Sequence, residues 1–326
     1  MISRSQVIEG PKPPQSELTT DFNFTIEKIN ALRGRPLFYP YVGSGLGRGP
    51  YVELEDGSVK LDLINGIGIH LMGHSHPVVI ESCLEGSLSD VVMQGHLEAN
   101  REYLNLSQKL VELASPKSKL RHAWLTTCGT MANENALKMA RQKTSPARMI
   151  ITMENAFAGR STMMAEVTDN PSFKQGLPEY HEVLRIPYPE KGMGADKKGK
   201  SLAKFKEHLA QHKNNICCFV FEPMLGEGGY KVPDREELIE ILKVCKDHKI
   251  PIWADEVQTF CRTGEFFAFE TLGFGEYVDI VTIAKTAQSG ATLYTEELNP
   301  QPGLIAGTFA SSSVSLRSGF RILEHL

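Results

Sequence analysis

The sequence has few of the features that mark metal-binding or disulfide-rich proteins. Its 326 residues include six cysteines, and no two of them have C-x-x-C spacing, so neither a zinc site nor a disulfide framework is indicated. We expect reduced, mostly buried thiols. Cys217 and Cys218 are adjacent in a strand pattern, which predicts that their side chains point to opposite faces. His74 and His76 have no nearby thiol, so we predict no metal ion there.

An excess of one charge and long apolar runs are also absent. The formal net charge is -4, so the basic excess typical of nucleic-acid-binding proteins is missing. No apolar run reaches the roughly 18 residues that can span a bilayer, and the first residues, MISRSQVIEGPKPPQ, contain no apolar signal core. We therefore expect a cytoplasmic protein that binds neither nucleic acid nor a membrane.

Composition and element patterns divide the chain into four parts. Residues 1–20 are polar, contain three prolines and are predicted to form an N-terminal arm. Residues 21–100 are predicted to be a small N-terminal segment and linker, with an antiparallel hairpin around Asp56-Gly57. Residues 101–310 are predicted to form a large domain, and residues 311–326 to begin a further helix.

Within the large domain, helical and strand patterns alternate. The spacing of apolar residues predicts helices at 99–114, 130–143, 201–212 and 234–249, and strands at 148–153, 216–222, 251–256 and 279–285. This alternation indicates an α/β fold with a mostly parallel sheet flanked by helices on both faces. Ligands on such sheets bind at the carboxyl ends of the strands, so the chemistry is sought there.

One candidate binding element is the segment TTCGTMANENALKMAR, residues 126–141. It follows an apolar run and opens a helix, where unpaired N–H groups and the positive end of the dipole attract anions. Gly129 allows close backbone approach, and Thr130 adds a hydroxyl group. The segment is interpreted either as a phosphate site or as an ordinary helix N-cap.

Two charged residues end apolar strands. Lys285 closes the strand in DIVTIAKTAQSG; it either extends to solvent or is a desolvated amine that forms a Schiff base with a carbonyl cofactor. Asp255 closes the strand in PIWADE, where it either forms a structural ion pair or binds a protonated pyridine nitrogen. Glu256 points to the other side of the strand end and is predicted to be structural. An amine, a carboxylate and a phosphate site together indicate pyridoxal 5'-phosphate.

The sequence resembles the class III (ω-amino acid) aminotransferases, which are fold-type I pyridoxal-phosphate enzymes. The resemblance runs from about Gly43 to the end of the chain and rests on seven motifs in the family's order: DLINGIGIHLMGHSHPVV, TTCGTMANENALKMAR, ENAFAGRS, FVFEPMLGEGGY, ADEVQTFCRTGEFFAFE, DIVTIAKTAQSG and AGTFASSS. It implies a fold-type I large domain. The small C-terminal domain of the family, which commonly supplies an arginine for the substrate carboxylate, has no counterpart in this sequence.

The resemblance also implies roles for single residues. Lys285 would be the Schiff-base lysine that moves the proton, and Asp255 would pair with the pyridinium nitrogen. The other residues that the resemblance places at the cofactor are Gln258 near the phenolic oxygen, Val257 and Phe157 on the two ring faces, and Gly129 and Thr130 at the phosphate.

Other residues are assigned to the substrate or to a second subunit. Thr308 matches the position whose hydroxyl reaches the phosphate in the partner subunit's site, which implies a homodimer. Glu227 matches a glutamate that switches the site between substrates. Tyr39 and Tyr41, near the N-terminus, are candidates for lining the substrate pocket, with ordinary aromatic packing as the alternative.

Several positions differ from the family pattern. Met131, Ala158 and Leu225 stand where glutamate, histidine and glutamine are usual. The stretch DEVQTFCRTG is one residue shorter than usual, and the interval from Lys285 to Thr308 is short. None of these differences removes the lysine, the aspartate or the phosphate site.

The function that the resemblance implies is a ping-pong aminotransferase. It would move the distal amino group of an ω-amino acid, such as ornithine, acetylornithine, lysine or γ-aminobutyrate, to a 2-oxo acid. Two alternatives stay open: an aminomutase that uses the same site, and a degenerate or truncated homologue that serves as a dimerising partner.

Overall fold

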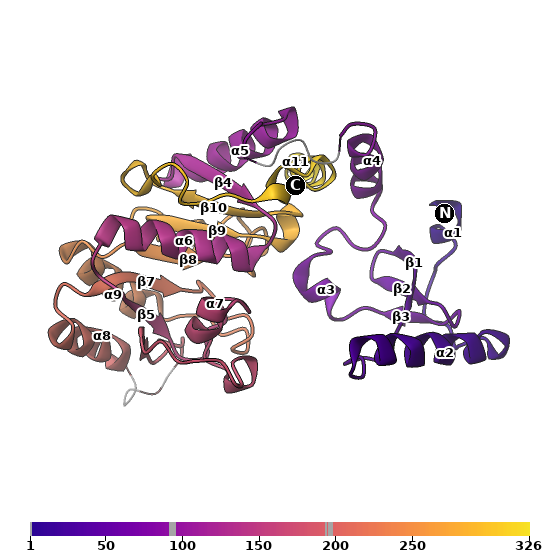
Figure 1. Cartoon of the computed structure of the whole chain (residues 1–326), viewed down its shortest axis with the longest axis horizontal. Coiled ribbons are helices and arrows are strands. Elements are labelled where there is room, and N and C mark those ends of the chain that lie inside the picture. The colour runs from indigo at the N-terminus through magenta and orange to yellow at the C-terminus, as the bar shows by residue number, and fades with distance from the viewer. Residues whose placement is uncertain (1, 91–95, 193, 195–197) are drawn as a thin grey trace. The chain divides into compact units, whose positions relative to one another are not determined.

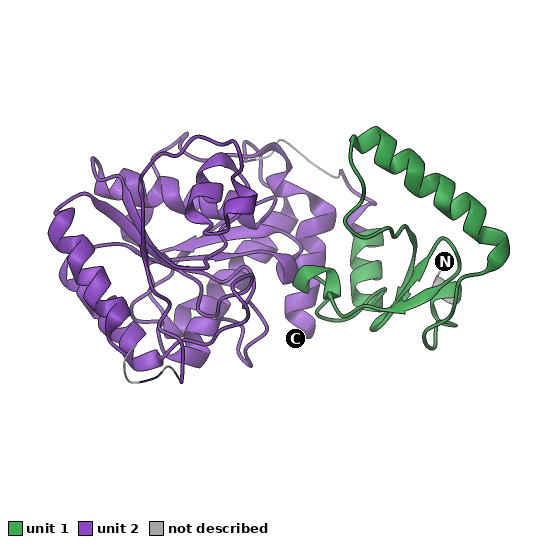
Figure 2. Ribbon diagram, turned by 90° about the horizontal axis from the view of Figure 1, so that it is seen from below, with its two compact units in different colours: residues 1–84 green, residues 85–326 purple. Residues whose placement is uncertain are grey.

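The chain divides into two compact units, residues 1–84 and residues 85–326 (Figure 2). The computed structural model describes residues 2–90, 96–192, 194 and 198–326. The division falls within helix α4 (Pro77–Gly86), whereas the sequence pattern placed the end of the N-terminal segment at residue 100.

The first unit is built around a small antiparallel sheet. Its elements are α1 (Ile2–Ser5), α2 (Ser16–Arg33), β1 (Gly43–Arg48), β2 (Tyr51–Leu54), β3 (Val59–Leu61), α3 (Asn65–Gly68) and most of α4. The predicted hairpin is confirmed: β2 and β3 pair antiparallel, and Gly57 lies between them at φ 74°. Ile8 is buried with Val59 in a small core, so part of the segment predicted as a polar arm packs against the sheet.

The second unit contains a seven-stranded sheet in the order β4-β10-β9-β8-β7-β5-β6 (Figure 1). The strands are β4 (His122–Thr126), β5 (Met149–Met153), β6 (Val183–Ile186), β7 (Ile216–Phe221), β8 (Ile252–Asp255), β9 (Ile280–Ile283) and β10 (Gly290–Tyr294). Strand β10 runs antiparallel to both of its neighbours, and the pairs from β9 through β6 are parallel. The predicted, mostly parallel α/β sheet is confirmed.

Helices cover both faces of this sheet. They are α5 (Arg101–Ala114), α6 (Gly129–Thr144), α7 (Thr162–Val167), α8 (Lys200–Gln211), α9 (Arg235–Asp247), α10 (Ala268–Leu272) and α11 (Ser313–His325). Side chains of α5, α8, α9 and α11 form one apolar core with the strands, and side chains of α6 and α7 form the other. Trp253 belongs to the α6 core and its neighbours Ile252 and Ala254 to the opposite one, as strand alternation requires.

The predicted alternation is wrong at Cys217 and Cys218. Met149 of β5 pairs with Ile216, whereas the next residue, Ile150, pairs with Cys218, so Cys217 is an extra residue in β7. Such a bulge leaves one residue unpaired and breaks the alternation of side chains. Both cysteines therefore belong to the core on the α6 side, and their Sγ atoms lie 3.8 Å apart.

The C-terminal helix packs within the second unit. Helix α11 lies beside α5, and Arg317 Nη2 donates to Glu102 Oε1 at 2.8 Å. Asn100 caps α5 by accepting from the Tyr103 N–H at 2.8 Å, and its Nδ2 donates to the Ser311 carbonyl at 2.9 Å. These bonds fasten residues just before α11 to the start of α5.

The part of the chain that the structure describes has neither a membrane-spanning helix nor a metal-binding cluster. In that part of the chain no helix has the length and apolar character needed to cross a bilayer. The same residues contain no group of three or more histidine, cysteine, aspartate or glutamate side chains suited to holding a metal ion.

Candidate active site

Three strands end in charged side chains at the same edge of the sheet. Asp255 is the last residue of β8, Lys285 follows β9 after one residue, and Glu222 directly follows β7. Because β7, β8 and β9 are parallel neighbours, their carboxyl ends lie side by side. The sequence predicted Asp255 and Lys285 at this edge but missed Glu222, although it carries the same signal: a carboxylate after an apolar strand.

Asp255 is a buried carboxylate with defined partners. Its Oδ2 accepts from Asn133 Nδ2 at 2.7 Å, and its Oδ1 accepts from the Val257 N–H at 3.0 Å. Burial raises the pKa of Asp255 to about 6, against the lowering effect of these hydrogen bonds and of the Lys285 charge. The side chain is therefore mostly ionised at neutral pH and held in a fixed orientation.

Lys285 occupies an unusual backbone conformation at the start of the short helix η3 (Lys285–Ala287). Its φ is 54°, in the left-handed region that residues other than glycine seldom adopt. Burial lowers the pKa of Lys285 and the Arg262 charge lowers it further, whereas Asp255 and two glutamates oppose this shift. Local strain and a depressed amine pKa are both typical of functional positions.

The predicted phosphate site is the N-terminus of α6. The helix begins at Gly129 and Thr130, and its N-cap residue, Cys128, makes no side-chain capping bond. A Cβ atom on Gly129 would lie 2.9 Å from Val257 Cγ1, so only glycine fits against that side chain. The N-terminus of this helix thus packs directly against the segment that follows Asp255.

Phe157 is held near this cluster by the buried Glu222. The Phe157 N–H donates to Glu222 Oε1 at 3.0 Å, and the Gly226 N–H donates to Glu222 Oε2 at 2.9 Å. The Phe157 ring meets that of Phe173 edge to face, with centroids 5.8 Å apart. Burial and then the Asp255 charge raise the pKa of Glu222 to about 8, so this side chain is largely protonated at neutral pH.

Arg262 connects two of the predicted segments. Its Nη1 donates to the Gln258 carbonyl, and its Nη2 donates to Thr286 Oγ1 at 3.0 Å. It therefore joins the segment after β8 to the turn that carries Lys285. Sequence reasoning missed this residue, because an arginine inside a motif gives no separate signal. Glu227 is exposed, and its charge still acts on Lys285.

The remaining predicted residues occupy exposed positions in the two units. Thr308 is exposed at the start of the short helix η5 (Thr308–Ser311) in the second unit. Tyr39 and Tyr41 belong to the first unit, are both about half exposed, and have stacked rings with centroids 6.2 Å apart. Lys285, Asp255 and the predicted phosphate site at the start of α6 all belong to the second unit, whereas the two tyrosines belong to the first.

Glu256 confirms its predicted structural role. Its carboxylate accepts from the N–H groups of Ala268 at 2.6 Å and Phe269 at 2.9 Å, and from Thr259 Oγ1 at 3.2 Å. The side chain is fully buried and satisfies the first N–H groups of α10. The adjacent carboxylates therefore have different partners. Asp255 bonds to Asn133 and the Val257 N–H, whereas Glu256 accepts from N–H groups at the start of α10.

The residues present fit the cofactor that the sequence predicts. Pyridoxal phosphate needs an amine for its carbonyl, an anion for its ring nitrogen and N–H donors for its phosphate, and Lys285, Asp255 and the start of α6 provide them. Asn133 Oδ1 and Arg262 Nε are buried without a hydrogen-bond partner among the described residues. Unsatisfied buried polar atoms beside this cluster are consistent with a site that receives a polar ligand.

Known proteins resemble this chain over most of its length. The family model described as "Aminotransferase class-III" matches residues 41–313. A probable 4-aminobutyrate aminotransferase of Bacillus subtilis is 30% identical over 298 residues, covering 85% of this chain and 67% of that protein. An acetylornithine aminotransferase of Methanocaldococcus jannaschii is 31% identical over 254 residues, covering 76% of this chain but 58% of that protein.

Solved structures share the fold. An (S)-enantioselective omega-transaminase from Thermomicrobium roseum superposes with a TM-score of 0.84 at 23% identity, covering 93% of this chain and 74% of that one. A taurine:2-oxoglutarate aminotransferase from Bifidobacterium kashiwanohense, solved with pyridoxal phosphate and glutamate, gives a TM-score of 0.81 at 20% identity. The chain thus has the fold of these enzymes and spans about 60 to 75% of the length of these four relatives.

Proposed function

Since this chain belongs to the class-III aminotransferases, we propose that it transfers the distal amino group of an ω-amino acid to a 2-oxo acid by a ping-pong cycle. Pyridoxal phosphate is the cofactor and Lys285 its Schiff-base lysine. The donor is of the ornithine, acetylornithine, lysine or 4-aminobutyrate type, which the names of the relatives support. The observation that carries the proposal is that Asp255 and Lys285 end adjacent parallel strands beside the start of α6.

Asp255 helps the cofactor ring to accept electrons during the reaction. The bound cofactor supplies an electron sink for the pair of electrons left when the substrate carbon loses its proton. A carboxylate fixed by Asn133 and by the Val257 N–H keeps a proton on the ring nitrogen, because its negative charge favours the protonated form. Burial strengthens this effect, since the interaction between opposite charges is screened less there than in water.

Lys285 supplies the amine and moves the proton. A lysine must be deprotonated to attack a carbonyl or to accept a proton, and its partial burial and the nearby Arg262 charge both favour the neutral form. Arg262 also bonds to Thr286, the residue after Lys285. It therefore positions the turn that carries Lys285 and also lowers the pKa of that lysine.

Other residues orient the cofactor. The backbone N–H groups at Gly129 and Thr130 bind the phosphate, aided by the positive end of the α6 dipole. Val257 and Phe157 would cover the two ring faces, and Gln258 would lie near the phenolic oxygen. The bond from the Phe157 N–H to Glu222, and the fit of Gly129 against Val257, support these placements.

The substrate is contacted by residues outside the cluster of Lys285 and Asp255. Glu227, which is exposed near that cluster, changes its contact between the two substrates of the cycle. Tyr39 and Tyr41 line the substrate pocket; their half-exposed rings leave area for contact with a bound molecule. Substituting each tyrosine by alanine is expected to raise KM for the donor with little change in kcat, since both residues would bind the substrate before and during the reaction alike.

The minimal active unit in this proposal is a homodimer, in which Thr308 binds the phosphate in the partner's site. The exposure of Thr308 supports a contact outside its own chain. Mixed dimers of Lys285→Ala and Thr308→Ala chains test this. If Thr308 acts in the partner's site, each mixed dimer keeps one intact site and regains activity that neither variant has alone. No gain on mixing would show that Thr308 acts in its own chain or not at all.

A half-reaction assay tests the function. Each candidate donor is added to the cofactor-loaded protein without a 2-oxo acid, and the release of one carbonyl product per site is measured with the conversion of the cofactor to its amine form. A transaminase releases this product and stops after one turnover. An aminomutase would isomerise its substrate without net release, and a degenerate homologue would do neither.

A further inference from the structure

The bulge in β7 creates a pair of neighbouring thiols. The Sγ atoms of Cys217 and Cys218 lie 3.8 Å apart on one face of the strand, and neither side chain is exposed. In a regular strand two successive side chains point to opposite faces, so this approach depends on the register shift between Met149 and Ile150. The active-site residues described above do not include either cysteine.

The pair lies beside a guanidinium group with an unused donor. Arg141, on α6, donates through Nη2 to Glu182 and, at 3.3 Å, to the Arg148 carbonyl, while its Nε is buried without a partner among the described residues. The hydrogen bond with Cys218 and the charge of Arg141 lower the pKa of Cys217, and the same bond raises the pKa of Cys218. The two thiols are thus adjacent and differ in acidity, with Cys217 the more acidic of the pair.

We propose that Cys217 and Cys218 form a vicinal dithiol site that binds a soft, thiophilic species, specifically a trivalent arsenical. Thiolates are the protein ligands that soft metals and metalloids prefer. On binding, two As–S bonds replace two As–O bonds, and the two thiol protons leave with the oxygen as water, so no oxidant or reductant is needed. A disulfide is the less favoured product, because Cα atoms of adjacent residues are about 3.8 Å apart and disulfides prefer at least about 4.4 Å.

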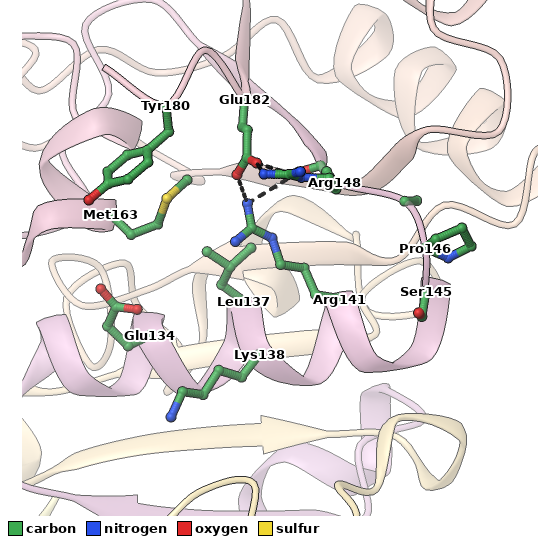
Figure 3. Close-up of a pocket in the computed structure, with 11 residues that line it drawn as sticks. Glu134, Leu137, Lys138, Arg141, Ser145, Pro146, Arg148, Met163, Tyr180 and Glu182 are labelled. Carbon is green, nitrogen blue, oxygen red and sulfur yellow. Dashed lines mark hydrogen bonds and ion pairs between the residues drawn. The ribbon is translucent and has the colours of Figure 1, made fainter. Parts of the chain in front are cut away.

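A cavity lies next to the segment that Cys217 contacts. It has a volume of about 570 Å³ and is lined by Arg141, Ala147, Arg148 and Glu182 among others (Figure 3). Cys217 Sγ donates to the Arg148 carbonyl at 3.5 Å, so the thiol lies directly behind this lining. Glu182 bonds to both arginines and so fixes this part of the lining (Figure 3).

Phenylarsine oxide is the probe for the site. The cofactor-loaded, full-length protein is incubated with it under reducing conditions, freed of excess reagent and weighed by intact mass spectrometry. We expect one arsenical per chain, retained in an excess of a monothiol and released by 2,3-dimercaptopropanol. Cys217→Ser and Cys218→Ser should each abolish retention, whereas Cys83→Ser, which changes a thiol of the other unit, should leave it intact. Retention by either of the first two variants, or none by the natural sequence, would overturn the proposal.

A second readout requires no variant and so does not depend on the variants folding. The labelled protein is denatured without added dithiol and alkylated, and its peptides are mapped. We expect Cys217 and Cys218 to be protected together and the other four cysteines to be alkylated. Alkylation of both members of the pair would contradict the site.

The rate at which the arsenical binds tests whether Glu182 and the two arginines limit access to the cysteine pair. Glu182→Gln weakens the bonds to Arg141 and Arg148 without removing a thiol, so we expect faster labelling with the same final stoichiometry. Lys204→Gln, which changes an exposed residue outside this cavity, is the control and should label at the original rate. An unchanged rate in Glu182→Gln would show that the thiols are reached by another route.

Discussion

Asn133 Nδ2 lies 2.7 Å from Asp255 Oδ2, and this buried bond joins the first turns of α6 to the end of β8. The same Nδ2 donates to the Ala158 carbonyl at 2.7 Å. In the proposed function the phosphate binds at the start of α6 and the ring nitrogen at Asp255, so Asn133 would fix the distance between the two ends of the cofactor site.

Asn133→Ala is expected to raise the pKa of Asp255 above about 6, because the bond to Asn133 favours the ionised carboxylate. Activity at neutral pH should fall roughly tenfold or more, as a hydrogen bond to a charged group contributes about 1.5–3 kcal/mol. The acid limb of the profile of kcat/KM against pH should move to higher pH. Asn135→Ala, on the same helix and equally buried, is the control and should leave that limb in place.

Substitutions of the two adjacent carboxylates are expected to affect different properties, stability for Glu256 and turnover for Asp255. Glu256→Ala leaves buried N–H groups of Ala268 and Phe269 without an acceptor, so the free energy of unfolding should drop by on the order of 3 kcal/mol. Asp255→Asn removes a charge but little volume, so it should abolish turnover while the protein stays folded. Urea unfolding and activity, measured on both variants, separate the two roles. Equal losses of stability would contradict the division.

Glu222 predicts how the stability of the cofactor-free protein depends on pH. Its pKa is raised to about 8 in the folded chain, so the folded state keeps a proton that the unfolded chain has released above about pH 4.5. The stability that this proton contributes is complete at low pH and is lost as the pH rises through about 8, at up to about 1.4 kcal/mol per pH unit.

Glu222→Gln should flatten that decline between about pH 7 and 8, where Asp255 and Glu256, with pKa values of about 6 and 7, contribute less. Urea unfolding at a series of pH values gives the slope, which is independent of any constant cost of the amide. Glu236→Gln, an exposed change on α9, should keep the original slope. An equally steep decline in Glu222→Gln would show that another group carries the proton.

Arg262 is expected to lower the pKa of Lys285. Arg262→Met removes a positive charge, so the pKa of Lys285 should rise and covalent attachment of the cofactor should require a higher pH. The change is followed by the absorbance of the loaded protein against pH. Arg235→Met, which alters an arginine bonded to the Leu272 carbonyl, is the control and should not move this profile. A shift to lower pH would contradict the assigned effect of the charge.

Much of the site could be predicted because it depends on strand ends. Asp255 and Lys285 each close an apolar strand, and parallel strands end at one edge, so their meeting follows from local patterns alone. The bulge at Cys217 could not be predicted, because it arises from the register between β7 and β5, which neither segment encodes by itself. The same limit applies to Asn133, whose partner Asp255 lies 122 residues away on another element.

Three assignments rest on the sequence alone. Motif position assigns Thr308, and aromatic character near the N-terminus assigns Tyr39 and Tyr41. The mixed-dimer assay is therefore the decisive test for Thr308.

The covalent attachment of pyridoxal phosphate tests the central claim most directly. The protein is incubated with the cofactor, reduced with borohydride and digested, and the modified peptide is identified by mass spectrometry. We predict a single pyridoxyl group per chain on Lys285, absent from Lys285→Ala but retained in Lys249→Ala, whose lysine lies at the opposite end of the sheet, next to β8. Labelling of another lysine in the natural sequence, or no uptake of the cofactor at all, would contradict the account.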